Sequence, residues 1–92
     1  MDITKRNGRQ EDYDGQKIIT AMKKAFESTG SNPAPSVMAD LLVSVEEKLT
    51  AKSITSVEGI QDQVEQTLME QGFFTEAKNY ILYRQKRSLL RD

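Results

Sequence analysis

The chain has 92 residues, of which 37% are hydrophobic and 29% charged, and a net charge of −1. This suits one folded domain over residues 1–92 with a modest core. Cysteine and histidine are both absent, which excludes disulfides, Cys/His zinc sites, thiol nucleophiles and histidine-based catalysis. No apolar run approaches the ~18 residues of a membrane span. No signal-peptide pattern opens the chain, so we expect a cytoplasmic protein without a membrane partner.

The charges are unevenly distributed along the chain. Residues 1–24 hold six Lys/Arg and four Asp/Glu. Residues 25–77 hold two Lys/Arg and nine Asp/Glu, and residues 78–92 hold five Lys/Arg and one Asp. Both ends are therefore basic and the middle is acidic. If the ends meet in the fold, their cations form a local anion site. The alternative is that they lie on solvated helix faces with a few salt bridges.

The first dozen residues read as two short strands. Asn7-Gly8 separates them and favours a type I′ turn, in which both residues take positive φ. Lys5, Arg6 and Arg9 surround this turn. A two-stranded hairpin is marginal alone, so we expect it to lean on the rest of the chain.

Two helices are predicted next. Asp14 is a credible N-cap for a helix that runs to about Ser28. Residues 29–35 form a loop that holds both prolines. Ser36 is the expected cap of a second helix, whose apolar residues follow the helical period to Leu49.

The second half of the chain predicts two more helices. Residues 50–55 are polar and partly β-branched, and can be a loop or a third short strand. Thr55 and Glu58 fit a capping box that starts a third helix, and Gly72 ends it. A fourth helix is expected over about residues 73–90. Its expected inward positions are Phe74, Ala77, Ile81 and Leu82. The pattern predicts a mainly α, α+β fold: a helical bundle with a small sheet at one end.

The chemistry that remains is anion recognition. Neither GxxxxGK[ST] nor GxGxxG is present, EF-hand spacing is absent, and nothing indicates an enzyme. Lys5 and Lys17 are compact cations suited to polyphosphate, and Arg6 and Arg9 offer planar forks for phosphate oxygens. The helix after Asp14 adds free N–H groups and a positive dipole end. Taken singly, each of these cations is more often an exposed surface charge.

Four blocks of sequence carry a resemblance to a known family. They are Lys5–Arg9, Tyr13–Ile18, Val57–Glu65 and Ala77–Arg87. In this order and spacing they resemble the ATP-cone domain, which sits at the end of many ribonucleotide reductase subunits and in their transcriptional repressor. The likeness covers essentially the whole chain and looks closest to the anaerobic and cobalamin-dependent reductase types.

The resemblance implies a non-catalytic regulatory domain that binds ATP or dATP and acts in deoxyribonucleotide biosynthesis. It implies a four-helix bundle capped by a small three-stranded β-sheet, made of the N-terminal hairpin and one short strand. In the family, ATP permits reductase activity and dATP stops it, usually by changing how subunits associate. The implied partners are ribonucleotide reductase subunits. The resemblance leaves open whether Mg²⁺ accompanies the nucleotide and whether the domain forms homo-oligomers.

Carried over by position, the resemblance places Lys5 and Arg6 at the triphosphate, with Lys17 closing on it from the first helix. Ile3 and Ile18 would contact the base. The further implied nucleotide-binding residues are Glu11, Asp14, Val57, Gln61, Arg84, Lys86 and Arg87. Among these, Asp14 would meet the sugar, and Glu11 matches a position that reads the base in some members and is apolar in others.

Two alternatives stay open from the sequence. No zinc-binding front end is present, so we expect an excised domain of a larger enzyme or a free-standing cone, not a complete repressor. The second function considered is a helical protein-interaction or nucleic-acid-binding module, in which the basic ends contact a partner or backbone phosphates. The slightly acidic overall balance argues against nucleic acid as the partner.

Overall fold

The computed structural model of the chain describes residues 2–5 and 7–91, with side chains up to Gln85. The described elements are β1 (Asp2–Thr4), β2 (Gln10–Asp12), α1 (Gly15–Ser28), α2 (Pro35–Ala51), α3 (Val57–Glu70) and α4 (Phe74–Arg91). The mainly helical α+β fold predicted from the sequence is confirmed. Among the described residues, no helix combines the length and apolar content needed to cross a membrane.

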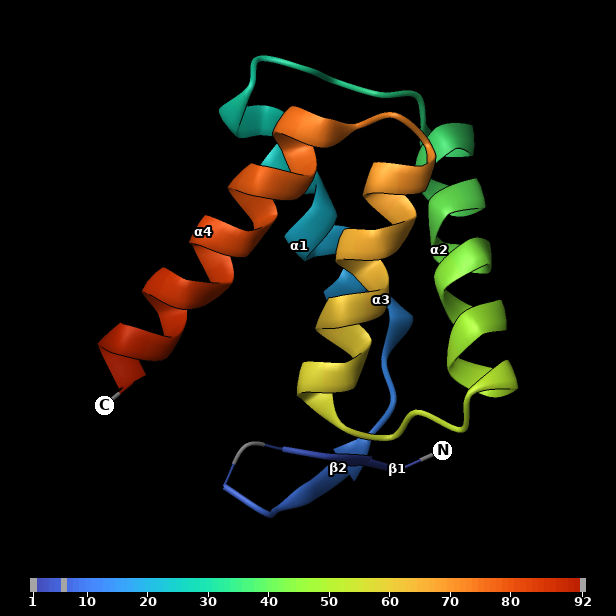
Figure 1. The fold of residues 1–92 in the computed structure, drawn as a ribbon, viewed down its shortest axis with the longest axis vertical. Helices are drawn as coiled ribbons and strands as arrows, with labels where there is room; N and C mark the ends of the chain where they lie inside the picture. Colours follow the sequence, from blue (N-terminus) through green and yellow to red (C-terminus); the bar gives the residue numbers. More distant parts are fainter. Residues whose placement is uncertain (1, 6, 92) are drawn as a thin grey trace.

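The four helices pack in a ring. Helix α1 packs against α2 and α4, and α3 packs against the same two helices. Figure 1 shows the hairpin at one end of this bundle, beneath α3, with α4 entering from the opposite end. The C-terminal half of α4 diverges from α3, toward the side of the hairpin. The hairpin, α1, α3 and α4 thus border a common region.

The core is made of the apolar stripes of all four helices, sealed at the hairpin end by Ile3. Its fully buried large side chains are Phe26, Met22, Leu49, Leu68, Val45, Val64 and Thr67. Ala77 is buried and Ile81 half-buried, as expected for inward positions of α4.

The inward assignments of Phe74 and Leu82 are wrong, since their side chains are 68% and 54% exposed. Phe73, just before α4, packs inward instead, with its ring edge-to-face on Phe26 at 5.0 Å. Tyr80 takes the inward position on the next turns and is almost fully buried. Leu82, two residues along, therefore points to the other side of the helix.

The hairpin is antiparallel, with Asp2 opposite Asp12, Ile3 opposite Glu11 and Thr4 opposite Gln10. The predicted type I′ turn is wrong: Gly8 has φ +86°, but the only described non-glycine residue at positive φ is Ser53. The loop is longer than a two-residue turn.

Two backbone bonds and one side-chain bond close this loop. Lys5 N–H donates to Arg9 O at 2.6 Å, and Gly8 N–H donates to Lys5 O at 2.9 Å. Asn7 Oδ1 accepts from Arg9 N–H at 3.0 Å. The side chain of Asn7 therefore supports the turn without a left-handed backbone at that residue.

The described sheet has two strands, so the three-stranded sheet is not shown. Helix α2 continues to Ala51 and takes up the first part of the segment expected to form the third strand. What remains of the expected third strand is one isolated parallel bridge between Thr4 and Ser56. Thr4 N–H donates to Thr55 O at 2.7 Å. This contact attaches the hairpin to the bundle.

The predicted helix caps are partly confirmed. The Asp14 side chain accepts from Gln16 N–H at 3.0 Å and caps α1. Ser36 is not a cap, because α2 begins at Pro35, whose missing N–H suits the first helical position. Thr55 is not the cap of α3 either: Ser56 Oγ accepts from the N–H of Gly59 at 3.0 Å.

Gly72 lies just past the end of α3, as predicted, and adopts the left-handed backbone with φ +87°. Phe73 N–H donates to Leu68 O and Gly72 N–H to Met69 O. This pair of bonds is the Schellman motif. It turns the chain so that Phe73 enters the core and α4 starts back along α3.

Candidate functional site

A cleft of about 1090 Å³ lies between the hairpin, α1, α3 and α4. The hairpin forms one wall because Ile3 is anchored in the core and Thr4 is bonded to Thr55. The N-terminal half of α1, the first turns of α3 and the middle of α4 supply the others.

The hairpin side of the cleft carries two lysines and one carboxylate. Glu11 Oε2 lies 3.2 Å from Lys5 Nζ and 3.3 Å from Lys17 Nζ. The hydrogen bond from Lys5 lowers the pKa of Glu11; partial burial opposes this, and Lys17 adds to the lowering. Glu11 is therefore ionised at neutral pH, and this corner holds one net positive charge among the three groups.

The cleft floor is apolar. Ile3, Ile18 and Ile60 are each less than a tenth exposed, and Val57 is half-buried beside them. They come from β1, α1 and α3, so the floor exists only when the hairpin is docked. Gln61, half-buried on α3, adds one amide group next to this floor. An apolar surface with a few polar groups at its edge is the usual composition of a small-molecule site.

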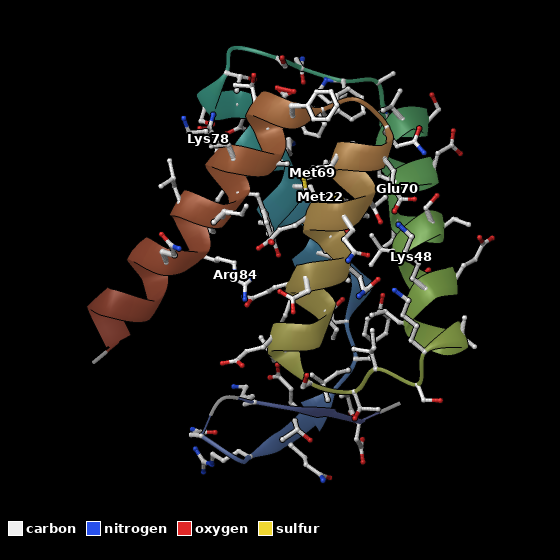
Figure 2. All side chains as sticks on the ribbon, viewed as in Figure 1. Met22, Lys48, Met69, Glu70, Lys78 and Arg84 are labelled. Carbon is white, nitrogen blue, oxygen red and sulfur yellow. The ribbon has the colours of Figure 1, made fainter. Side chains whose placement is uncertain are left out.

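The α4 side of the cleft contains Tyr80, Tyr83 and Arg84. Arg84 forms ion pairs with Asp62, at 3.1 Å, and with Glu65, both on α3. Figure 2 shows Arg84 reaching from α4 toward α3. Burial disfavours the charged guanidinium, but the hydrogen bonds to Glu65 and Asp62 outweigh it and raise the pKa of Arg84. Arg84 thus stays charged and braces the two helices.

The start of α1 differs from the expected free anion site. Gln16 N–H donates to Asp14 Oδ1 at 3.0 Å, and Lys17 N–H donates to the Asp14 carbonyl at 3.2 Å. The capping carboxylate also places a negative charge at the helix N-terminus. In this structure the cationic corner of the cleft is therefore supplied by lysine side chains.

The structure brings most of the predicted site residues together along this cleft. Those that line it are Ile3, Lys5, Glu11, Asp14, Lys17, Ile18, Val57, Gln61 and Arg84. Arg6 lies outside the described residues. Lys86 and Arg87 belong to α4, but their side chains lie outside the described part of the chain. The role of all these residues in binding a nucleotide stays a prediction.

Sequence reasoning missed several residues that line the cleft. Thr20 and Lys24 follow Lys17 by three and seven positions on α1, and Glu65 follows Gln61 by four on α3. These spacings put each on the same helix face as a predicted site residue. Helical periodicity applied to Lys17 and Gln61 could therefore have found them. Tyr83 precedes Arg87 by four positions on α4, so the same rule applies to it.

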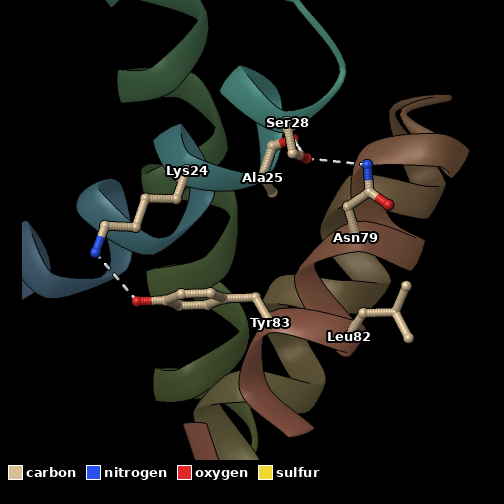
Figure 3. A pocket seen from close by; sticks show the side chains of 6 residues that line it. All are labelled: Lys24, Ala25, Ser28, Asn79, Leu82 and Tyr83. Carbon is tan, nitrogen blue, oxygen red and sulfur yellow. Dashed lines mark hydrogen bonds between the residues drawn. The ribbon is translucent and has the colours of Figure 1, made fainter. Parts of the chain in front are cut away.

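A second, smaller pocket of about 260 Å³ lies between α1 and α4 and shares Lys24 and Tyr83 with the cleft. Figure 3 shows Lys24 reaching the Tyr83 hydroxyl, with Nζ to Oη at 3.2 Å. In the same view Asn79 donates to Ser28 Oγ at 3.0 Å. The Lys24–Tyr83 pair thus forms the boundary between the two cavities.

No cluster of three or more Asp or Glu side chains that could hold a metal ion occurs within the described residues. Three of the carboxylates at the cleft have other partners: Glu11 and Glu65 pair with cations, and Asp14 caps α1. The described lining of the cleft thus combines cations with carboxylates, beside aromatic and apolar side chains. The cations are Lys5, Lys17, Lys24 and Arg84, and the carboxylates are Glu11, Asp12, Asp14, Glu58 and Glu65.

Comparison with known proteins gives one family. The family model described as ATP cone domain matches residues 1–89. A ribonucleoside-diphosphate reductase subunit alpha from Treponema pallidum is 41% identical over 96% of the chain, and one from Chlamydia muridarum is 34% identical over all of it. A vitamin B12-dependent ribonucleoside-diphosphate reductase from Thermoplasma acidophilum is 38% identical over 99% of the chain. The chain spans about a tenth of the length of these relatives, 11%, 10% and 12% respectively.

Proposed function

The chain belongs to the ATP-cone family, and from this premise we propose that it is a non-catalytic allosteric domain that binds ATP or dATP in the cleft between the hairpin, α1, α3 and α4. We further propose that it regulates a ribonucleotide reductase, since its relatives carry that name. Binding would change how the reductase subunits associate.

The observation that carries the proposal is the division of the cleft into two chemistries. Lys5 and Lys17 lie at one end, on the hairpin and on the first turn of α1. The apolar floor of Ile3, Ile18 and Val57 adjoins them. A nucleoside triphosphate has the same division, because its phosphates need cations and its base needs an apolar surface with a few polar groups.

In the proposed complex the triphosphate lies against Lys5 and Lys17, together with Arg6. The base lies over Ile3 and Ile18, with Val57 and Gln61 alongside. Asp14 faces the sugar. Arg84, Lys86 and Arg87 contribute positive charge from α4. If Mg²⁺ accompanies the nucleotide, the phosphates themselves would supply its oxygen ligands, as such ions usually retain few protein ligands.

Regulation by two such similar ligands requires two states of the protein. ATP and dATP differ in one hydroxyl group, and a site that hydrogen-bonds this group loses about 1–3 kcal/mol when it is absent. An opposite effect on activity therefore depends on which conformation or assembly each nucleotide favours. The cleft suits this role because it joins three helices to a hairpin held by few backbone bonds.

Calorimetric titration of the 92-residue chain with ATP, dATP and GTP tests the proposal. We expect both adenine nucleotides to bind, and tighter than GTP. Replacing Lys5 and Lys17 together by alanine should weaken the binding of ATP more than the binding of AMP. The matched control replaces Lys23 and Lys78, two exposed lysines outside the cleft, and should leave ATP binding nearly unchanged. Absence of binding by ATP and dATP at millimolar concentration would refute the proposal.

A further inference from the structure

The two cleft lysines already share a partner in the structure without ligand. Lys5 and Lys17 both reach the same oxygen atom of Glu11, at 3.2 and 3.3 Å. The three groups come from different parts of the fold: the hairpin loop just after β1, the middle of β2 and the first turn of α1. A single carboxylate oxygen therefore bridges the hairpin to the helix.

The fold directs Glu11 into this position. Glu11 is the cross-strand partner of Ile3, and directly paired residues in a sheet project to the same face. Ile3 is buried against the bundle, with 3% exposure, so Glu11 also points toward the cleft. An ionised carboxylate on this face would lack compensation without a cationic partner. Lys5 and Lys17 provide it.

The lysines remain open to solvent while the carboxylate lies deeper. The side chains of Lys5 and Lys17 are 44% and 65% exposed, whereas that of Glu11 is 28% exposed. An anion entering from solvent can therefore contact both ammonium groups from the side opposite Glu11. The same lysines then have two competing acceptors, one internal and one external.

We propose that Glu11 is an internal stand-in for phosphate, whose carboxylate holds Lys5 and Lys17 in the free domain and is exchanged for phosphate oxygens when a polyphosphate binds. This inference rests on the proposed function of the cleft. The exchange makes the site selective, because a ligand must contact both lysines at once to replace what the carboxylate supplied. Glu11 thereby lowers the affinity of the site for phosphate ligands.

The test uses inorganic tripolyphosphate, which has no base or sugar, alongside ATP. Both are titrated into the wild-type 92-residue chain, into Glu11→Gln and into Asp12→Asn. The second variant removes the same charge at the next residue of β2, which also lines the cleft but has no ion pair to these lysines among the described contacts. Far-ultraviolet circular dichroism and thermal melts confirm that each variant is folded.

We expect Glu11→Gln to bind tripolyphosphate roughly fivefold more tightly, about the factor that one unit charge some 4 Å away produces in water. Asp12→Asn should give a clearly smaller gain, because it removes only general repulsion. In a background that carries Lys5→Ala and Lys17→Ala, adding Glu11→Gln should not raise the affinity for tripolyphosphate, since the lysines that exchange partners are gone.

Four results would overturn the inference. In the first, Glu11→Gln binds tripolyphosphate no more tightly than the wild type does. In the second, its gain in affinity equals that of Asp12→Asn. In the third, the gain persists when Lys5 and Lys17 are replaced by alanine. If Glu11 only reads the base, Glu11→Gln weakens ATP and leaves tripolyphosphate unchanged, which also overturns it. Failure of the proposed function looks different, since ATP then fails to bind the wild-type chain.

Discussion

The Tyr13 hydroxyl donates a hydrogen bond of 2.7 Å to Glu46 Oε2, joining residues 33 positions apart. Tyr13 lies in the link between β2 and α1, and Glu46 lies on α2. Burial, followed by the bond to Glu46, raises the pKa of Tyr13, so the hydroxyl stays protonated and remains a donor at neutral pH. This bond and the Thr4–Thr55 bond hold the base of the hairpin against the bundle.

Tyr13→Phe should therefore lower the free energy of unfolding by about 1 kcal/mol, the usual net value of such a bond. Urea denaturation followed by circular dichroism measures it. The loss should shrink when Glu46 is replaced by alanine first, because the bond is then already absent. Equal stability of wild type and Tyr13→Phe would show that the bond does not hold the hairpin.

Gly59 packs too closely for any larger residue. A Cβ atom at Gly59 would lie 2.6 Å from Ile54 Cγ2 and 2.9 Å from Ser56 Oγ. We expect Gly59→Ala to lower stability by about 1–3 kcal/mol, as it displaces Ile54 and the cap of α3. The matched control is Gly15→Ala in the first turn of α1, where the nearest atoms lie at 3.4 Å. Thermal melts in which both variants behave alike would contradict this account.

Ser53 ends α2 with a left-handed backbone, φ +53°. Ile54 N–H donates to Leu49 O and Ser53 N–H to Thr50 O, the same motif that Gly72 forms after α3. Serine adopts this conformation at a cost that glycine avoids. Ser53→Gly should raise stability by about 0.5 kcal/mol, measured by urea denaturation. Ser53→Ala is the control and should not raise the free energy of unfolding. A lower free energy of unfolding for Ser53→Gly would show that Ser53 carries no such strain.

Arg84 braces α4 against α3 through Asp62 and Glu65. Arg84→Met keeps the apolar stem and removes the ion pairs, and should lower stability by about 1 kcal/mol at low salt. The deficit should narrow as ionic strength rises. Arg84 is held by two carboxylates and its side chain is 22% exposed, whereas Lys17 has one such partner and is 65% exposed. The loss of Arg84 should therefore weaken ATP binding less than Lys17→Ala does. Denaturation at two salt concentrations and calorimetry check both points; a larger loss of ATP affinity than with Lys17→Ala would contradict them.

The helices were predictable because each carries an apolar stripe and ends at turn-forming residues. Asp14 and Gly72 act as predicted, because a strong cap residue and a glycine after a helix are local signals. The other two predicted caps were displaced, to Ala34 and Ser56. Other errors lie where the packing of the folded chain selects one of two adjacent residues. Phe73 enters the core in place of Phe74, because the chain turn after α3 sets the phase of α4. The expected third strand is reduced to one bridge, because α2 extends to Ala51 over the start of that segment.

The sequence predicted which residues line the candidate site better than it predicted which of them form ion pairs. Family resemblance selected Lys5, Lys17 and Arg84, and the structure places all three along one cleft. The pairing of these cations with Glu11 and Glu65 could not be predicted, because it depends on strand register and helix packing. The closeness of α1 and α4 that brings Lys24 to Tyr83 is likewise a property of the folded chain.

The central claim is that an adenine nucleotide binds between the hairpin, α1, α3 and α4. Amide NMR spectra of the isotope-labelled 92-residue chain, recorded as ATP is added, test it most directly. We predict that the largest shifts fall on residues around Ile3, Lys17 and Gln61, with little change along the outer face of α2 near Val43. The account would be contradicted if the amide signals of the hairpin and the first turn of α1 did not move and the shifted signals clustered elsewhere.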